Sequence, residues 1–296
     1  MLYKQENITL VDEVRKTGRG NRVWIEILKF LAVLTPINLI MVFAGEAIKA
    51  ALFQKSVINE EISMIIQLYE CALGIGLVVL YCCCIEKRTF MSMGFMKRHV
   101  CKQYIKGACV GAMLISALVW MGVLFNTFIF NGFNVNLDKK SIFLFLGGFL
   151  LQGFYEELVF RGFFMISIIR KNTIFVAVMV NSILFGLTHG FNNGFQVLAL
   201  LNLILFGIFE SIYLLKTGNI WGISAIHSMW NFIQGNIYGF NVSGMAQSQS
   251  IFIFKINNCE IFSGGTFGLE GSLLTTIVLL SAINMVILYN TALQLQ

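Results

Sequence analysis

Long apolar stretches alternate with short polar ones along most of the 296-residue chain. A helix needs about 20 predominantly apolar residues to cross the roughly 30 Å hydrocarbon core of a bilayer. About eight stretches reach this length, so the pattern predicts an all-α, polytopic bundle of transmembrane helices. The predicted spans are residues 27–48, 62–85, 104–130, 141–168, 172–191, 195–215, 219–239 and 271–293.

The connections between the later spans carry turn signals. The fifth and sixth spans are joined through residues 191–194 and the sixth and seventh through residues 216–219, both containing Asn and Gly. Residues 240–270 mix polar side chains with a short apolar patch, and we assign no span to them. The predicted organisation is an N-terminal segment, 1–26, followed by one transmembrane domain, 27–293, whose candidate catalytic core is about 141–293.

Composition supports the membrane interpretation. Apolar residues make up 57% of the chain and charged residues only 12%, whereas soluble domains carry about 25% charged residues. The formal net charge is +6, but the basic residues interrupt the apolar runs and do not form one face or stripe. This distribution excludes a nucleic-acid-binding surface. Lipid is therefore the expected solvent.

The distribution of Lys and Arg predicts the orientation. Fourteen of the 21 fall in the N-terminal segment and in the second, fourth and sixth loops, and five fall on the other side. The positive-inside rule then places both termini of this multi-pass cell-membrane protein in the cytoplasm.

Several ionisable and polar side chains lie inside the predicted spans. A charged group at that depth costs a few kcal/mol or more, so each one is a functional candidate. They come from the fourth, fifth and seventh spans, which are distant in sequence. The candidates are Glu156, Glu157, Arg161, His189, His227 and Asn231.

Helix geometry predicts that these groups meet. Glu157 and Arg161 are four residues apart, on one helix face, where their charges neutralise each other. Glu156 is rotated by about 100° from Glu157 and is free to face another helix. Glu156 lies 16 residues before a predicted turn near Asn172, and His189 lies 17 residues after it. At 1.5 Å per residue, both lie about 25 Å from the turn, at matching depth.

Such a layer supports two kinds of chemistry. Glu156, His189 and His227 have the donor atoms for a Zn²⁺ ion with one position left for water. Alternatively, Glu156 and one imidazole activate water directly, and His227 and Asn231 donate to the developing oxyanion. Either arrangement would hydrolyse an amide bond inside the membrane. The competing interpretation is a buried polar network that only locks helix packing.

The ordered motifs resemble those of the CAAX-protease and bacteriocin-processing family of intramembrane proteases, also called the Abi family. The family pattern EExxxR, FxxxH and HxxxN is similar to Glu156-Glu157 with Arg161, Phe185 with His189, and His227 with Asn231. Residues 93–95 and 264–271 also resemble bacterial members, so the resemblance covers roughly residues 90–290.

The resemblance implies an intramembrane endopeptidase. Glu156 and His189 would activate the catalytic water, His227 and Asn231 would stabilise the oxyanion, and Glu157, Arg161 and Phe185 would support them. Zinc dependence stays open, because a glutamate and two histidines serve both mechanisms. The expected substrate is a small peptide or a lipidated protein. The alternatives are a non-catalytic bacteriocin-immunity or scaffold protein and a secondary transporter. The sequence does not indicate an oligomeric state.

Overall fold

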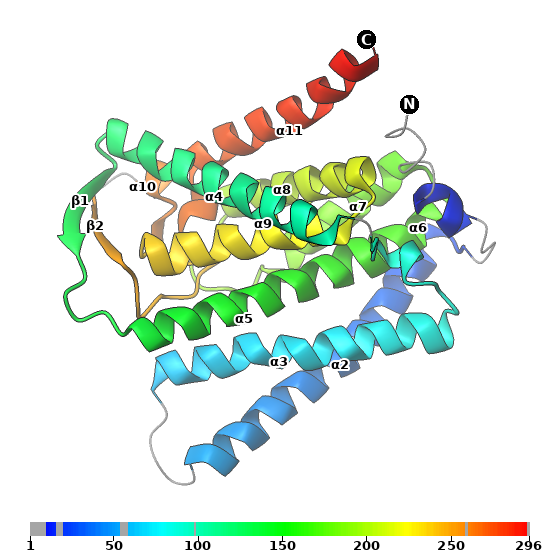
Figure 1. Cartoon of the computed structure of the whole chain (residues 1–296), viewed down its shortest axis with the longest axis horizontal. Helices are drawn as coiled ribbons and strands as arrows, with labels where there is room; N and C mark the ends of the chain where they lie inside the picture. Colours follow the sequence, from blue (N-terminus) through cyan, green and yellow to red (C-terminus); the bar gives the residue numbers. More distant parts are fainter. Residues whose placement is uncertain (1–9, 16–19, 54–58, 98, 258–259, 295–296) are drawn as a thin grey trace.

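The computed structural model describes residues 10–15, 20–53, 59–97, 99–257 and 260–294, which form a helical bundle (Figure 1). Three helices continue into π-helical segments, and one small two-stranded sheet lies at an end of the bundle. The main helices are α2 (Val23–Phe53), α3 (Glu60–Leu80) with η1 (Tyr81–Ile85), α4 (Val100–Leu124), α5 (Lys139–Glu157) with η3 (Leu158–Met165) and α6 (Ile166–Ile169), α7 (Ile174–Thr188), α8 (Val197–Thr217), α9 (Ile220–Phe232) with η4 (Ile233–Ile237), and α11 (Leu273–Gln294).

The all-α transmembrane prediction is confirmed, and each of the eight predicted spans overlaps one of these helices. Five described helical stretches are long and apolar enough to cross a membrane: α2, α3 with η1, α4, α5 through α6, and α8. Helices α7 and α11 are shorter apolar helices. The turn predicted near Asn172 lies between α6 and α7. The chain is therefore a multi-pass membrane protein.

The predicted third span, 104–130, is wrong at its end. Helix α4 stops at Leu124, and strand β1 (Phe128–Phe133) follows it. β1 pairs in antiparallel fashion with β2 (Phe252–Ile256), which lies in the segment left without a predicted span. The remainder of that segment contains α10 (Glu260–Ser263) and the 3₁₀ turns η5 (Gly265–Phe267) and η6 (Leu269–Gly271). An apolar run alone does not distinguish a helix end from a strand.

Helix α9 lies inside the bundle and packs against α4 and α5. Glycines allow this close approach. A Cβ atom on Gly107 of α4 would lie 2.1 Å from the carbonyl oxygen of Gly222, and one on Gly111 would lie 2.4 Å from that of Ile226. Small residues spaced four apart let membrane helices pack backbone to backbone. α9 can therefore carry its polar side chains to the centre of the protein.

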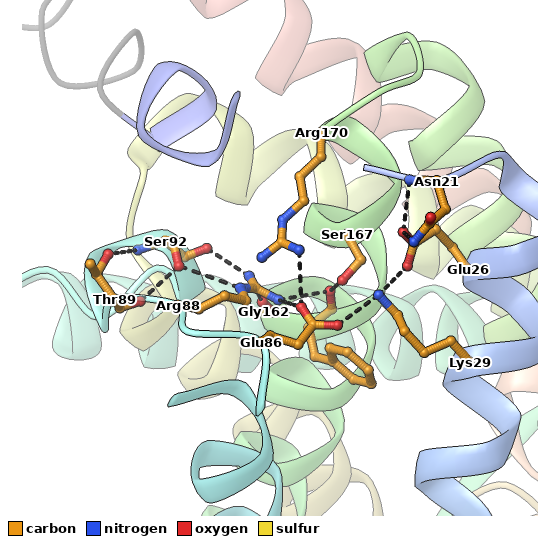
Figure 2. Close-up of polar contacts among 11 residues, drawn as sticks. Asn21, Glu26, Lys29, Glu86, Arg88, Thr89, Ser92, Gly162, Ser167 and Arg170 are labelled. Carbon is orange, nitrogen blue, oxygen red and sulfur yellow. Dashed lines mark hydrogen bonds and ion pairs between the residues drawn. The ribbon is translucent and has the colours of Figure 1, made fainter. Parts of the chain in front are cut away.

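A charged cluster joins α2, the α3–α4 connection and the end of α6 (Figure 2). Lys29, which lies within the apolar α2, contacts Glu86 at 2.6 Å and also pairs with Glu26. Glu86 accepts a second contact from Arg170 at 3.1 Å. Burial alone would raise the pKa of Glu86, but Lys29, Arg88 and Arg170 lower it below its ordinary value. The charged cluster thus ties the first long helix to the core.

Arg88 connects this cluster to the π-helical segment η3. Its guanidinium is fully buried and donates to the carbonyl oxygens of Gly162 at 2.7 Å and Phe163 at 3.2 Å, both in η3, and of Ser92 at 2.9 Å (Figure 2). π-Helical turns are rare and occur frequently at functional sites. Arg88 therefore supplies hydrogen-bond donors to the helix segment that begins directly after Glu157.

Replacing Arg88 by alanine is expected to destabilise the protein by about 2–4 kcal/mol, because buried carbonyl groups lose charged donors and a cavity is left. Arg88→Lys should recover part of this loss, since an ammonium group cannot reach all three carbonyls in the same geometry. Thermal unfolding in detergent measures the effect. Lys87→Ala is the matched control, because it removes the same charge from the neighbouring, exposed position. Equal unfolding temperatures for the two alanine variants would contradict the role given to Arg88.

Candidate active site

Glu157 and Arg161 form the buried centre of the site. Both side chains are completely buried, and Arg161 Nη1 donates to Glu157 Oε1 at 2.9 Å. The same oxygen receives a second contact from α9, because His227 Nδ1 lies 2.7 Å away. A carboxylate oxygen only accepts, so Nδ1 carries a proton and Glu157 fixes the orientation of the imidazole. Arg161 contacts Glu157 as the spacing predicts, whereas the bond to His227 depends on tertiary packing.

Gly153 allows this contact between α5 and α9. A Cβ atom at position 153 would lie 2.7 Å from the backbone nitrogen of Ser228 and 2.5 Å from its Oγ. Such distances are far below a normal van der Waals contact, so any larger residue would force the two helices apart. The neighbouring His227 would then move away from Glu157. The glycine is thus required for the site to assemble.

Phe185 lies between the arginine and the two imidazoles. The guanidinium carbon of Arg161 is 4.6 Å from the centre of the Phe185 ring. The ring centre lies 5.0 Å from the imidazole of His189 and 6.1 Å from that of His227. A guanidinium over an aromatic face is attracted by the ring quadrupole. Phe185 thus brings α7 against the charged centre, a position compatible with the predicted supporting role.

Glu156 faces His227 from the other side of the imidazole. His227 Nε2 lies 3.8 Å from Glu156 Oε2. Glu156 Oε1 accepts a 2.5 Å hydrogen bond from Gln152 Nε2, and Gln152 Oε1 in turn accepts from Asn231 Nδ2 at 2.9 Å. Glu156 and Asn231 are therefore linked through Gln152, a residue that the sequence analysis missed. Its signal was present, because Gln152 stands four residues before Glu156 on the same helix face.

His189 caps the C-terminal end of α7 and is half-buried. Its Nδ1 lies 2.9 Å from the carbonyl oxygen of Phe185. Because a carbonyl only accepts, Nδ1 carries the proton and Nε2 is the basic nitrogen of the neutral ring. His189 makes no described hydrogen bond or ion pair to Glu156 or His227. It joins them by lining the same cavity.

This cavity has a volume of about 390 Å³. It is bounded by α2, α3, α5, η3, α7, α8, α9, α11 and the segments between α9 and α11. Among the described residues that line it, acidic and imidazole groups are the only titratable side chains apart from Tyr155. The polar and titratable lining residues are Asn38, Gln67, Gln152, Tyr155, Glu156, Thr188, His189, Asn192, Asn202, His227, Asn231, Ser243, Glu270 and Thr275.

The predicted zinc ligands do not converge in this arrangement. Among the described residues, no group of three or more His, Cys, Asp or Glu side chains is placed to hold a metal ion. The Nδ1 atoms of His189 and His227 are engaged by Phe185 and Glu157. Zinc binding by Glu156, His189 and His227 stays a prediction, which elemental analysis of the purified protein can test.

Glu210 belongs to the surroundings of this site. Glu210 is the only charged residue of the predicted span 195–215, and no role is predicted for it from the sequence. The side chain is fully buried in α8, and it interacts electrostatically with Glu157 and Arg161. The position of a residue along a helix does not show whether its side chain faces lipid or the protein interior. Only helix packing therefore shows that this third carboxyl group lies near Glu157 and Arg161.

Glu270 is a second acidic group of the cavity that the sequence analysis missed. It lies in η6, is 6% exposed, and accepts hydrogen bonds from Gln234 Nε2 at 2.5 Å and Ser243 Oγ at 3.3 Å. Burial raises the pKa of Glu270 to about 7, although these donors act in the opposite direction. The signal was the isolated carboxylate in the glycine-rich segment 264–271.

Comparison with protein families identifies the segment that carries the site. A family model described as type II CAAX prenyl endopeptidase Rce1-like matches residues 138–233, which run from the residue before α5 to the residue after α9. All seven side chains singled out from the sequence motifs lie within this match. No curated protein matches the chain. The segment built from α5 through α9 is thus similar to the Rce1-like type II CAAX prenyl endopeptidase family, in agreement with the resemblance of the motifs, and this similarity supports a CAAX-protease-type enzyme.

Proposed function

We propose that the protein is an intramembrane endopeptidase that hydrolyses a peptide bond of a small peptide or a lipidated protein in the cavity beside α5, α7 and α9. One observation carries this proposal. The carboxylate of Glu156, the imidazoles of His189 and His227 and the amide of Asn231 line a single cavity, within the segment that matches the family. A carboxylate base with convergent hydrogen-bond donors is the arrangement that amide hydrolysis requires.

Glu156 is the proposed general base. No hydrogen-bond donor within the described residues reaches its Oε2 atom, while Gln152 holds Oε1. Oε2 takes a proton from water as the water oxygen forms a bond to the substrate carbonyl carbon. His189 Nε2 is free to accept the second hydrogen of that water and orient it. When the C–N bond breaks, Glu156 returns its proton to the leaving nitrogen, which yields a carboxylic acid and an amine.

His227 and Asn231 are the proposed oxyanion donors. To donate from Nε2 while Nδ1–H is bound to Glu157, His227 must be an imidazolium. Asn231 Nδ2 has two hydrogens. It donates one to Gln152 Oε1, so the second is available to the oxyanion. Two donors fixed in a buried site stabilise the charge that develops on the substrate oxygen.

His189→Ala tests this function, because the half-buried side chain can be removed with little effect on packing. We expect kcat/KM to fall about a hundredfold or more while the unfolding temperature is unchanged. The assay uses the purified protein in lipid nanodiscs, a peptide library with and without a prenyl group, and mass spectrometry of products formed in ¹⁸O-labelled water. Hydrolysis places the label in the new carboxyl group.

His99→Ala is the matched control, because His99 is exposed and lies outside the cavity. It should retain wild-type cleavage. Wild-type rates in His189→Ala would refute the role of this residue. A wild-type protein that cleaves no member of the library would instead favour a non-catalytic immunity or scaffold protein.

A further inference from the structure

The position of Glu270 is not explained by the end of a helix. Helix α11 begins at Leu273, and the residue that caps it is Ser272, whose Oγ accepts from the Thr275 backbone nitrogen at 3.1 Å. A carboxylate that only served the helix dipole would lie in the first turn of the helix. Glu270 lies before the cap, and its side chain lines the cavity that holds Glu156 and the two imidazoles.

Polar groups from three other segments hold Glu270 in place. Gln234 of η4 and Ser243 of the following loop donate to its two carboxylate oxygens. Its backbone is held as well, because Asn202 Nδ2 of α8 donates to the carbonyl oxygens of Glu270 at 2.7 Å and Ser272 at 2.8 Å. Each carboxylate oxygen has two lone pairs, so each can accept one further hydrogen bond. The Glu270 carboxylate is thus fixed in orientation and can still accept hydrogen bonds from a ligand.

The charges around the cavity favour a cation. Its described lining contains the carboxyl groups of Glu156 and Glu270 and no Lys or Arg side chain. The one cation that the proposed mechanism gives this lining is His227, and its two ring nitrogens face Glu156 and Glu157. A positively charged group that entered would therefore find Glu270 as the carboxylate with no cationic partner among the described lining residues. A buried carboxylate that is already fixed by neutral donors forms strong, charge-assisted hydrogen bonds with such a group.

We propose that Glu270 forms a substrate subsite for a positively charged side chain, lysine or arginine, near the peptide bond that is cleaved. This inference rests on the proposed function, since it assigns a substrate class to the same cavity. The raised pKa of Glu270 supports it, because a carboxyl group near half ionisation gains its full charge when a cation binds beside it. Glu156 stays available for water, because Glu270 is a separate carboxylate, carried by η6 rather than α5.

Peptide pairs that differ only by lysine or norleucine test the subsite, because norleucine keeps the aliphatic stem of lysine without its charge. The pair is moved through each position on both sides of the cleaved bond, and kcat/KM is measured with the full chain in nanodiscs. At one position we expect the wild type to prefer lysine by about tenfold. Glu270→Gln should lower this ratio to about one, because the lysine peptide loses more of its kcat/KM than the norleucine peptide does.

Glu260→Gln provides the control, because Glu260 lies in the same C-terminal segment but is exposed. It should keep the wild-type preference. A purely structural role for Glu270 would lower both rates together and leave their ratio unchanged, and this result would overturn the subsite. So would cleavage by the wild type without any preference for lysine. Failure of the wild type to cleave any peptide would contradict the proposed hydrolysis itself, and the subsite with it.

Discussion

Glu156→Gln is expected to lower kcat/KM for peptide cleavage by about two to four orders of magnitude, the range that a positioned general base contributes. The substitution keeps the shape of the side chain and an oxygen that accepts from Gln152. It removes only the basic oxygen, Oε2, which would take the proton from water. The protein should therefore insert, fold and unfold as the wild type does, while the chemical step is lost.

Single-turnover cleavage and thermal unfolding, measured on the same preparation, separate these effects. Glu46→Gln is the control, because it is the same substitution at an exposed carboxylate of α2. Cleavage by Glu156→Gln at a rate close to that of the wild type would remove Glu156 from the proposed mechanism. A lowered unfolding temperature would show that Glu156 also supports the fold.

Arg161→Met is expected to cost about 3–5 kcal/mol of stability and to abolish activity. It removes the arginine of a completely buried ion pair and leaves Glu157 with His227 as its one remaining partner. Breaking a buried pair by removing one partner is strongly destabilising. It also removes the guanidinium that lies against the ring of Phe185. Thermal unfolding in detergent and peptide cleavage measure the two effects.

The double variant Glu157→Gln/Arg161→Met separates stability from catalysis. Removing both charges should restore much of the stability, since a buried ion pair replaced by neutral groups is often tolerated. Activity should not return, because His227 loses the carboxylate that fixes its imidazole. If Arg161→Met alone unfolds at the wild-type temperature, the buried ion pair has no structural role. Full activity in the double variant would refute the part of Glu157 in orienting His227.

The sequence determined the features that depend on the chain's local geometry. Long apolar runs determine transmembrane helices because lipid satisfies no backbone polar group. The spacing of four residues lets Arg161 contact Glu157. The common distance from the turn near Asn172 places Glu156 and His189 at the depth of one cavity. The motifs likewise indicated the family that matches residues 138–233. The contact of Arg161 with Glu157 and the matching depth of Glu156 and His189 depend only on the rise and rotation per residue within a single helix or hairpin.

Only the tertiary structure decided how separate elements face one another. Periodicity gives the depth of a side chain, but not the rotation of one helix about its axis relative to the next. That rotation depends on close approaches such as Gly153 against Ser228, and it gave the imidazole of His227 its short contact with Glu157 and a longer one with Glu156. For the same reason the bridge through Gln152, the buried Glu210 and the subsite carboxylate of Glu270 could not be placed by reading one segment at a time.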